Sequence, residues 1–228
     1  MNQMVEAADD DRGVAQRIEQ ALRARIVRGE LAADTPLRQD HIAREFQASA
    51  IPVREAFRRL ERTGLVAFRP RRGAVVSAVT AADAWEVAEM RAAIEGLALD
   101  GAMRRRKPGP VPAARAAIAA SDASDDAQTW LAQNRAFHRA LYAAAERPRV
   151  IAAIEELWLT GDRHLMQVWT AIDYQQRSQD EHRALLAEVE AGRRAAALRT
   201  LKAHILDAGR TLARLIEAGE RGGEKGAA

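Results

Sequence analysis

The chain contains five histidines and no cysteine, so a metal site would have to use imidazole, carboxylate or amide ligands. Asn134 and His138 are four residues apart, which places both side chains on one face of a helix. His182 and His204 fall in two later segments that also have helical patterning. Three imidazoles and an amide oxygen that meet inside a helical bundle could bind a divalent metal. Spacing does not show that these faces meet, and a lone histidine on a helix is more often a core or surface residue.

A second group of candidate residues consists of arginines on a predicted helix over 50–62. Arg54 and Arg58 lie one turn apart on one side of this helix. The guanidinium fork of arginine matches a guanine edge or a phosphate, so this side could contact DNA. An ordinary amphipathic surface helix would look similar. The opposite side is apolar and would face a core, with Val53, Ala56, Phe57 and Leu60.

Three helices and a hairpin must position these arginines. Ser49 is a good N-cap residue for the third helix, and Gly64 follows its end. A turn-forming basic segment, Arg69-Pro70-Arg71-Arg72-Gly73, joins two strand-like runs and suits a wing that contacts phosphates or the minor groove. The order predicts a winged helix-turn-helix domain over 12–78, with helices at 12–30, 39–46 and 50–62 and strands at 65–68 and 74–78.

The charge distribution favours a phosphate-rich partner for the same segment. Residues 12–80 carry 14 arginines and seven acidic residues, whereas residues 81–228 carry 21 basic and 21 acidic residues. The formal net charge of +3 therefore conceals a strongly basic region. A basic patch of this kind is typical of nucleic-acid binding, although basic surfaces can also serve solubility alone.

The remainder of the chain predicts an all-α bundle over 80–218, followed by a glycine-rich tail at 219–228 that we expect to be disordered. The fold class is therefore mainly α, with a winged helix-turn-helix before a helical domain. The acidic N-terminus does not resemble a signal peptide and no apolar run is long enough for a membrane span, which predicts a cytoplasmic protein. Six helices are expected, near 80–106, 111–121, 126–145, 148–171, 174–191 and 193–218.

Residues 49–66, SAIPVREAFRRLERTGLV, resemble the GntR family signature S-R-T-P-V-R-E-A-L-R-R-L-E-x-x-G-L-V. Residues 71–76 resemble the family's R-x-G-x-x-V wing, and residues 26–31 its I-x-x-G-x-L segment. The resemblance implies a transcriptional regulator that binds double-stranded DNA. Ala50 and Ile51 replace the usual arginine and threonine, so the operator is expected to differ from the common one. We expect Arg54 to contact a base or phosphate, and the phosphate-contacting residues to be Arg38, Ser49, Arg58, Arg71, Arg72 and Gly73.

The motif Asn134-Arg135-Ala136-Phe137-His138 resembles the [DN]-x-x-F-H motif of the FCD ligand-binding domain, which accompanies the winged helix in the FadR-type branch. Residues 181–186, EHRALL, match a second stretch of that domain, and residues 91–95, RAAIE, a third. The resemblance implies a divalent metal, with zinc favoured over nickel or manganese, and a small organic acid as effector. Its implied ligands are Asn134, His138, His182 and His204.

Two residues of this domain carry separate expectations. Most metal-binding members have aspartate where this chain has Asn134, so we expect weaker metal binding and a more electropositive site. Arg91 is a candidate partner for the effector carboxylate. A surface ion pair between Arg91 and Glu95, four residues on, explains the same spacing equally well.

The main hypothesis is a metabolite-responsive repressor or activator that binds a palindromic operator as a homodimer. The alternative is a metal-dependent hydrolase that uses the three-histidine site and is fused to a nucleic-acid-binding domain. The sequence lacks an H-E-x-x-H motif that would supply a general base, so no enzymatic activity is expected. A third possibility is a purely structural bundle fused to a nucleic-acid anchor.

Overall fold

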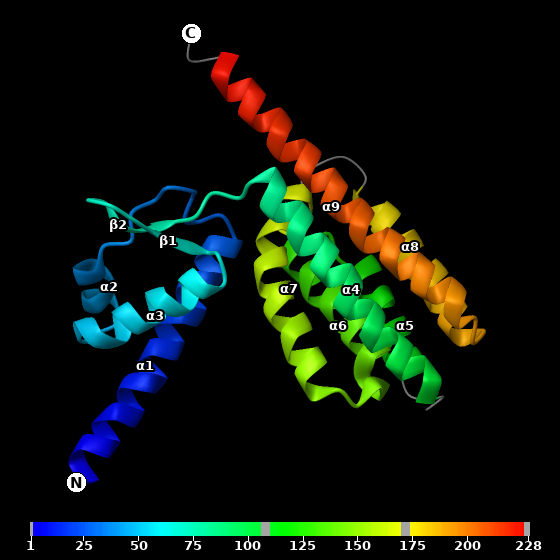
Figure 1. The fold of residues 1–228 in the computed structure, drawn as a ribbon, viewed down its shortest axis with the longest axis horizontal. Helices are drawn as coiled ribbons and strands as arrows, with labels where there is room; N and C mark the ends of the chain where they lie inside the picture. Colours follow the sequence, from blue (N-terminus) through cyan, green and yellow to red (C-terminus); the bar gives the residue numbers. More distant parts are fainter. Residues whose placement is uncertain (1, 106–109, 170–173, 226–228) are drawn as a thin grey trace. The chain divides into compact units, whose positions relative to one another are not determined.

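The computed structural model describes residues 2–105, 110–169 and 174–225, with side chains described for 11–105, 111–161 and 174–218. The chain divides into two compact units, Met1–Val79 and Thr80–Ala228 (Figure 1). Each unit has its own hydrophobic core. Among the described residues, no helix is both long enough and apolar enough to cross a membrane.

The first unit is a winged helix-turn-helix, as the sequence predicts. Its hairpin is antiparallel, with Val66 opposite Val76 and Arg69 opposite Gly73. Helix α1 packs on α3, and α2 also contacts α3. The elements are α1 (Asn2–Val27), α2 (Gln39–Glu45), α3 (Ala50–Arg62), β1 (Val66–Arg69) and β2 (Gly73–Val76).

Two turns fix the direction of β1 and of the wing tip in this unit. Gly64 adopts a φ of 68°, which ends α3 and lets the Leu65 amide bond the Leu60 carbonyl at 3.0 Å before β1 begins. At the wing tip, Arg71 and Gly73 have φ values of 63° and 69°. A left-handed conformation costs an arginine about 1–2 kcal/mol. The short hairpin connection holds Arg71 in this conformation despite the cost. The wing therefore presents its arginines at the end of a fixed turn.

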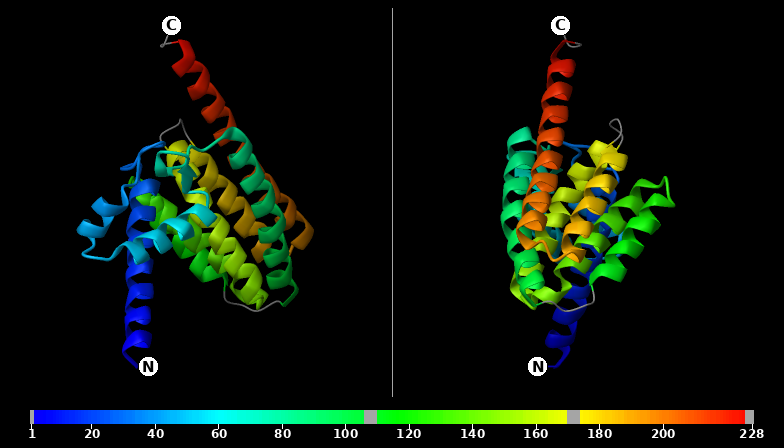
Figure 2. Two further views of the ribbon diagram at one scale, coloured as in Figure 1. Left: turned by 60° about the vertical axis from the view of Figure 1, so that its left-hand side comes forward. Right: turned by 90° about the vertical axis from the view of Figure 1, so that its right-hand side faces the viewer.

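The second unit is an all-α bundle, again as predicted. Helices α4 and α9 lie side by side in all three views, and α5 packs on α6 and α8 (Figures 1 and 2). Gly209 permits the close approach of α9 to α4, because a Cβ atom there would lie 2.4 Å from the Ala88 Cβ. The elements are α4 (Ala81–Arg105), α5 (Pro110–Asp122), α6 (Ala127–Tyr142), a 3₁₀ turn η1 (Ala143–Ala145), α7 (Pro148–Trp169), α8 (Tyr174–Glu190) and α9 (Arg194–Lys225).

The ends of several helices differ from the sequence predictions. Helix α1 begins at Asn2 rather than near residue 12, because nothing before Gly13 breaks a helix once it has formed. Helix α9 continues to Lys225 through residues expected to be disordered. Extending an existing helix avoids the nucleation cost that disfavours short isolated helices. The predicted break at 107–110 lies almost entirely outside the described residues.

Candidate metal centre and DNA interface

Three histidines from three helices meet in the interior of the second unit. His138 comes from α6, His182 from α8 and His204 from α9. One ring nitrogen from each lies within 4.8 Å of the others. Their exposed fractions are 0%, 1% and 6%, so the cluster is screened from solvent. Asn134, one turn before His138, is also buried.

Local sequence signals set the orientation of α6. Asp126 is its N-cap, and the carboxylate accepts a hydrogen bond from the Thr129 amide at 2.7 Å. This cap satisfies one of the free amides of the first turn. Trp130 and Phe137 are fully buried on the inward face of α6. That face also carries His138 into the core.

The Nδ1 atom of each histidine in the cluster has a polar partner. His138 Nδ1 lies 3.1 Å from the Tyr142 hydroxyl, and His182 Nδ1 lies 2.9 Å from Gln179 Oε1. His204 Nδ1 lies 2.7 Å from Glu181 Oε2. A partner on one ring nitrogen fixes the tautomer and the ring orientation for ligation through the other.

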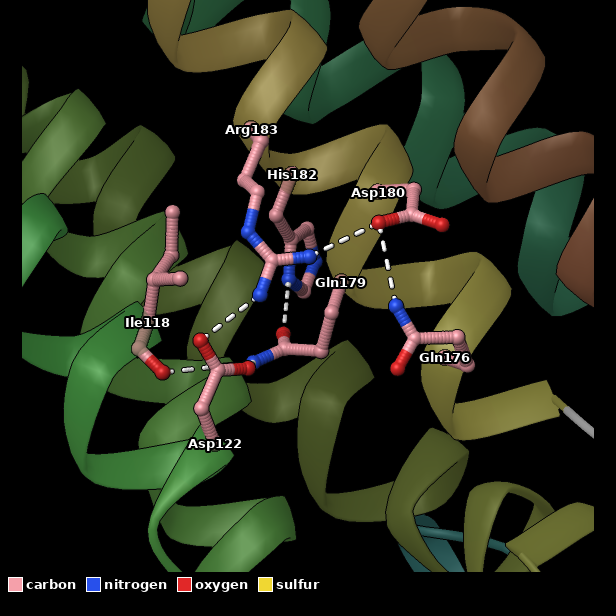
Figure 3. A network of polar contacts seen from close by, with 7 residues as sticks. All are labelled: Ile118, Asp122, Gln176, Gln179, Asp180, His182 and Arg183. Atoms are coloured by element: carbon pink, nitrogen blue, oxygen red, sulfur yellow. Dashed lines mark hydrogen bonds and ion pairs between the residues drawn. The ribbon is translucent and has the colours of Figure 1, made fainter.

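The partner of His182 can act only as an acceptor. Gln179 Nε2 lies 2.9 Å from Asp122 Oδ1 and 3.3 Å from the Ile118 carbonyl oxygen (Figure 3). Both of these oxygens are acceptors, so the amide nitrogen must face them and Oε1 must face His182. His182 Nδ1 therefore donates, and its Nε2 carries a lone pair.

The same reasoning applies to His138. The Tyr142 hydroxyl donates to Glu95 Oε2 at 2.7 Å, so its oxygen accepts from His138 Nδ1. His138 Nε2 then also carries a lone pair. These two Nε2 atoms are buried and have no hydrogen-bond partner among the described residues. Leaving a buried polar atom unpaired costs about 1–3 kcal/mol, which coordination of a cation would remove.

Burial keeps these two imidazoles neutral. Desolvation lowers the pKa of His138 and of His182 well below the usual value, and neighbouring imidazoles of the cluster lower both further. A neutral imidazole is the state that binds a metal. The donor set and its protonation therefore fit a divalent cation of the zinc or nickel type.

A buried carboxylate network supports the cluster from α4. Glu95 is 0% exposed and accepts from Arg91 Nε at 2.7 Å and from Trp158 Nε1 at 3.0 Å, in addition to Tyr142. The sequence suggested the Arg91–Glu95 pair only as a surface contact, and the structure corrects this, because both residues lie in the core. Since both oxygens of Glu95 are engaged, this carboxylate is not free to act as a general base.

Arg91 is held charged inside the bundle. Burial opposes its charge, but the carboxylate of Glu95 outweighs this effect and the pKa of Arg91 is raised. Its Nε is committed to Glu95, whereas its Nη1 points toward α7 at Gly161. A Cβ atom on Gly161 would lie 3.7 Å from Arg91 Nη1, which is an ordinary van der Waals contact, so the guanidinium packs closely against α7.

The predicted DNA-contacting residues lie on exposed parts of the first unit. Arg54 and Arg58 are exposed on α3, and their side chains have no ion pair or hydrogen bond within the described part of the chain. Arg59 on the same helix is instead paired with Glu19 and Glu55. The remaining predicted residues are also exposed: Arg38, Ser49, Arg71, Arg72 and Gly73.

Ser49 differs from its predicted local role. It occupies the N-cap position of α3 with an extended backbone, φ −73° and ψ 172°, but its hydroxyl makes no capping hydrogen bond. The sequence identified the position correctly and the bond wrongly. A hydroxyl that does not cap the helix can be used in an intermolecular contact.

Comparison with known proteins identifies this architecture. The family model "Bacterial regulatory proteins, gntR family" matches residues 14–76, and the FCD domain model matches residues 86–207. The chain is a GntR family regulator with an FCD domain. The GntR match covers α3 and the wing, and the FCD match contains all three clustered histidines.

Relatives of this GntR regulator are themselves transcriptional regulators. An Agrobacterium vitis HTH-type regulator from the TAR-I ttuE-ttuC′ intergenic region is 33% identical over 110 residues, 46% of this chain and 64% of that protein. A Paenarthrobacter nicotinovorans protein, described as a probable D-xylose utilization operon transcriptional repressor, is 28% identical over 181 residues, 78% of this chain and 80% of its own.

A solved structure supports the same assignment. A GntR family member from Pseudomonas syringae pv. tomato aligns with a TM-score of 0.59 and 28% identity, covering 92% of this chain and 89% of that one. The protein is therefore a DNA-binding transcriptional regulator, and its family and relatives indicate a regulator rather than an enzyme.

Proposed function

We propose that this regulator binds a divalent metal through Asn134, His138, His182 and His204, and that the centre holds a small carboxylate effector. The observation that carries the proposal is the set of buried imidazoles whose Nδ1 atoms are occupied, while two of their Nε2 atoms have no hydrogen-bond partner among the described residues. Zinc, with nickel or manganese as alternatives, suits such nitrogen and amide-oxygen donors. A bound metal would supply a localised positive charge for a carboxylate oxygen.

Arg91 is the proposed second contact for the effector. Its guanidinium stays charged in the core and is oriented by Glu95 through Nε, and the described residues place no hydrogen bond on its terminal nitrogens. An arginine fork binds carboxylates with two parallel hydrogen bonds. Gly161 places no side chain against Arg91 Nη1, where a Cβ atom would already be in van der Waals contact at 3.7 Å.

The regulatory output is operator binding by a homodimer. We infer that Arg54 contacts a base or phosphate, and that Arg38, Ser49, Arg58 and the wing residues Arg71, Arg72 and Gly73 contact the backbone. Within the described part of the chain Arg54 and Arg58 have no ion-pair or hydrogen-bond partner, which supports this role, because their charges are available to phosphates and base edges. Effector binding then shifts the population of dimers able to span two half-sites of a palindrome.

The metal half of the proposal is tested by elemental analysis of purified protein. Wild type is expected to retain about one metal ion per chain, and His182→Ala to lose it. The exposed His41, in the other unit, provides a matched control, and His41→Ala should keep the wild-type metal content. Equal metal content in wild type and His182→Ala would remove this site from the proposal.

The effector half is tested by thermal unfolding with a panel of organic acids and their uncharged amides. Acids should raise the melting temperature of metal-loaded protein and change its affinity for an operator duplex, whereas the amides should do neither. Arg91→Gln should weaken the response to acids. Acids and amides that stabilise the protein equally, with and without metal, would rule out a carboxylate effector at this centre.

A further inference from the structure

Ile51 is exposed at the start of α3. Its exposed fraction of 61% is the largest among the exposed large hydrophobic residues of the described chain. The next two residues of the same helix, Pro52 and Val53, are buried, so the side chains that follow Ile51 face the core. Exposing an isoleucine to water brings no folding benefit, which points to a role outside the folded unit.

Ile51 continues the arginine side of the helix. Arg54 is three residues after it and Arg58 seven, so the three side chains share one exposed face. Both arginines lack partners within the described residues, and the face is therefore apolar at its first turn and cationic beyond it. Ala50, also exposed, adds no polar group at the helix start.

In a helix-turn-helix, here α2 and α3, the first residues of the second of the two helices lie closest to the base edges in the major groove. In this protein that helix is α3, which begins at Ala50. Only thymine presents an apolar group there, the C5-methyl; the other bases present donors and acceptors. An isoleucine facing a guanine or cytosine edge would leave those polar atoms desolvated and unpaired. The side chain at position 51 therefore matches one base.

Building on the proposed operator binding through α3, we propose that Ile51 reads the C5-methyl group of a thymine, next to the base or phosphate that Arg54 contacts. The operator then carries an A·T pair at this position, and its recognition depends on van der Waals contact rather than on a hydrogen bond. Each buried methyl group contributes about fourfold in affinity, the equivalent of the usual transfer free energy of one CH₂ group.

The test compares thymine with uracil, which keeps every hydrogen-bonding group and lacks only the methyl. Full-length wild-type protein first selects its preferred duplex from a randomised library. That duplex is then resynthesised with deoxyuridine at one thymine at a time, and binding is measured by fluorescence anisotropy. Each half-site should contain one thymine whose replacement by deoxyuridine, made singly, weakens wild-type binding by about fourfold.

The same substitution should leave Ile51→Ala binding nearly unchanged, because the alanine methyl is too short to reach the thymine methyl. Leu97→Ala removes an exposed hydrophobic side chain in the other unit and should keep the wild-type ratio of thymine to uracil affinity. Since Ile51 is exposed, the variant should melt at the wild-type temperature. A wild type insensitive to uracil at every thymine, or an Ile51→Ala variant that retains the full thymine preference, would overturn the proposal.

Discussion

The orientation of Gln179 depends on a carboxylate from another helix, and Asp122→Asn tests this dependence. Asp122 on α5 accepts from Gln179 Nε2 at 2.9 Å, which keeps Gln179 Oε1 toward His182 (Figure 3). An asparagine at 122 can present its own NH₂ group, so the Gln179 amide can turn over. Its nitrogen would then donate to His182, whose Nε2 would carry the proton and could not bind a metal.

The structure sets the expected magnitude. Loss of a partner that orients a metal-binding histidine typically lowers metal affinity about 10- to 100-fold. The Ile118 carbonyl, 3.3 Å from Gln179 Nε2, still favours the original orientation, so the lower end applies. We expect about tenfold weaker metal binding, or about 1.4 kcal/mol. Stability should change little, because the Asp122–Arg183 ion pair that is also lost is 40% and 44% exposed.

The assay has two readouts and a matched control. Competition with a chelator gives the metal affinity, and ¹⁵N chemical shifts of histidine in metal-free protein give the His182 tautomer. Asp180→Asn is the control, since the Asp180 carboxylate also pairs with Arg183 at 2.7 Å, whereas its recorded hydrogen-bond partners among the described residues are Gln176 and Arg183, not the Gln179 amide. Wild-type affinity and an unchanged tautomer in Asp122→Asn, or an equal loss of affinity in Asp180→Asn, would refute the reasoning.

Three further predictions address the two units. Arg54→Ala should abolish specific operator binding. Arg72→Ala should only weaken binding and, in titrations at several salt concentrations, reduce the slope of log affinity against log salt concentration by about one. Equal operator binding by Arg54→Ala and wild type would exclude Arg54 from recognition. Gly209→Ala should lower the free energy of unfolding in urea by about 1–3 kcal/mol, because the new Cβ would meet Ala88 at 2.4 Å. Its control, Gly96→Ala on α4, has no atom within 4 Å and should gain up to about 1 kcal/mol. In metal-free protein, His138 and His182 have lowered pKa values and therefore take up protons only when the protein unfolds. The free energy of unfolding should then fall as the pH drops below 6.5, by up to about 1.4 kcal/mol per pH unit for each imidazole. A urea midpoint that does not change with pH would contradict this.

The sequence predicts the first unit well because its signals are local. The apolar period of α3 and the stop at Gly64 each act within one or two turns of the chain. The helix ends were less predictable: α1 begins ten residues early and η1 replaces the last turn expected for α6. Fraying and extension depend on small propensity differences rather than on a single residue.

The candidate metal centre was only partly predictable because its geometry is tertiary. The four-residue spacing of Asn134 and His138 follows from helix periodicity, but no spacing shows that α8 and α9 face the same point. The spacing of Glu95 gives a signal only for its contact with Arg91, and its hydrogen bond with Tyr142, the partner of His138, joins residues 47 positions apart. Gln179 and Asp122, 57 residues apart, carry no sequence signal. Such partners appear only once the helices are packed.

The charges around the histidine cluster determine how much positive charge a bound metal would keep, and therefore which kind of ligand it would favour. A carboxylate stands behind each histidine, directly or through one neutral side chain, and each carboxylate is paired with an arginine. Counted over the described residues, the surroundings are therefore close to neutral, and Asn134 adds no negative charge. A divalent cation here would keep most of its charge, so an anionic ligand would bind more strongly than a neutral one. This balance supports a carboxylate effector and rests on three ion pairs: Glu95–Arg91 at 2.7 Å, Asp122–Arg183 at 2.7 Å and Glu181–Arg177 at 3.6 Å.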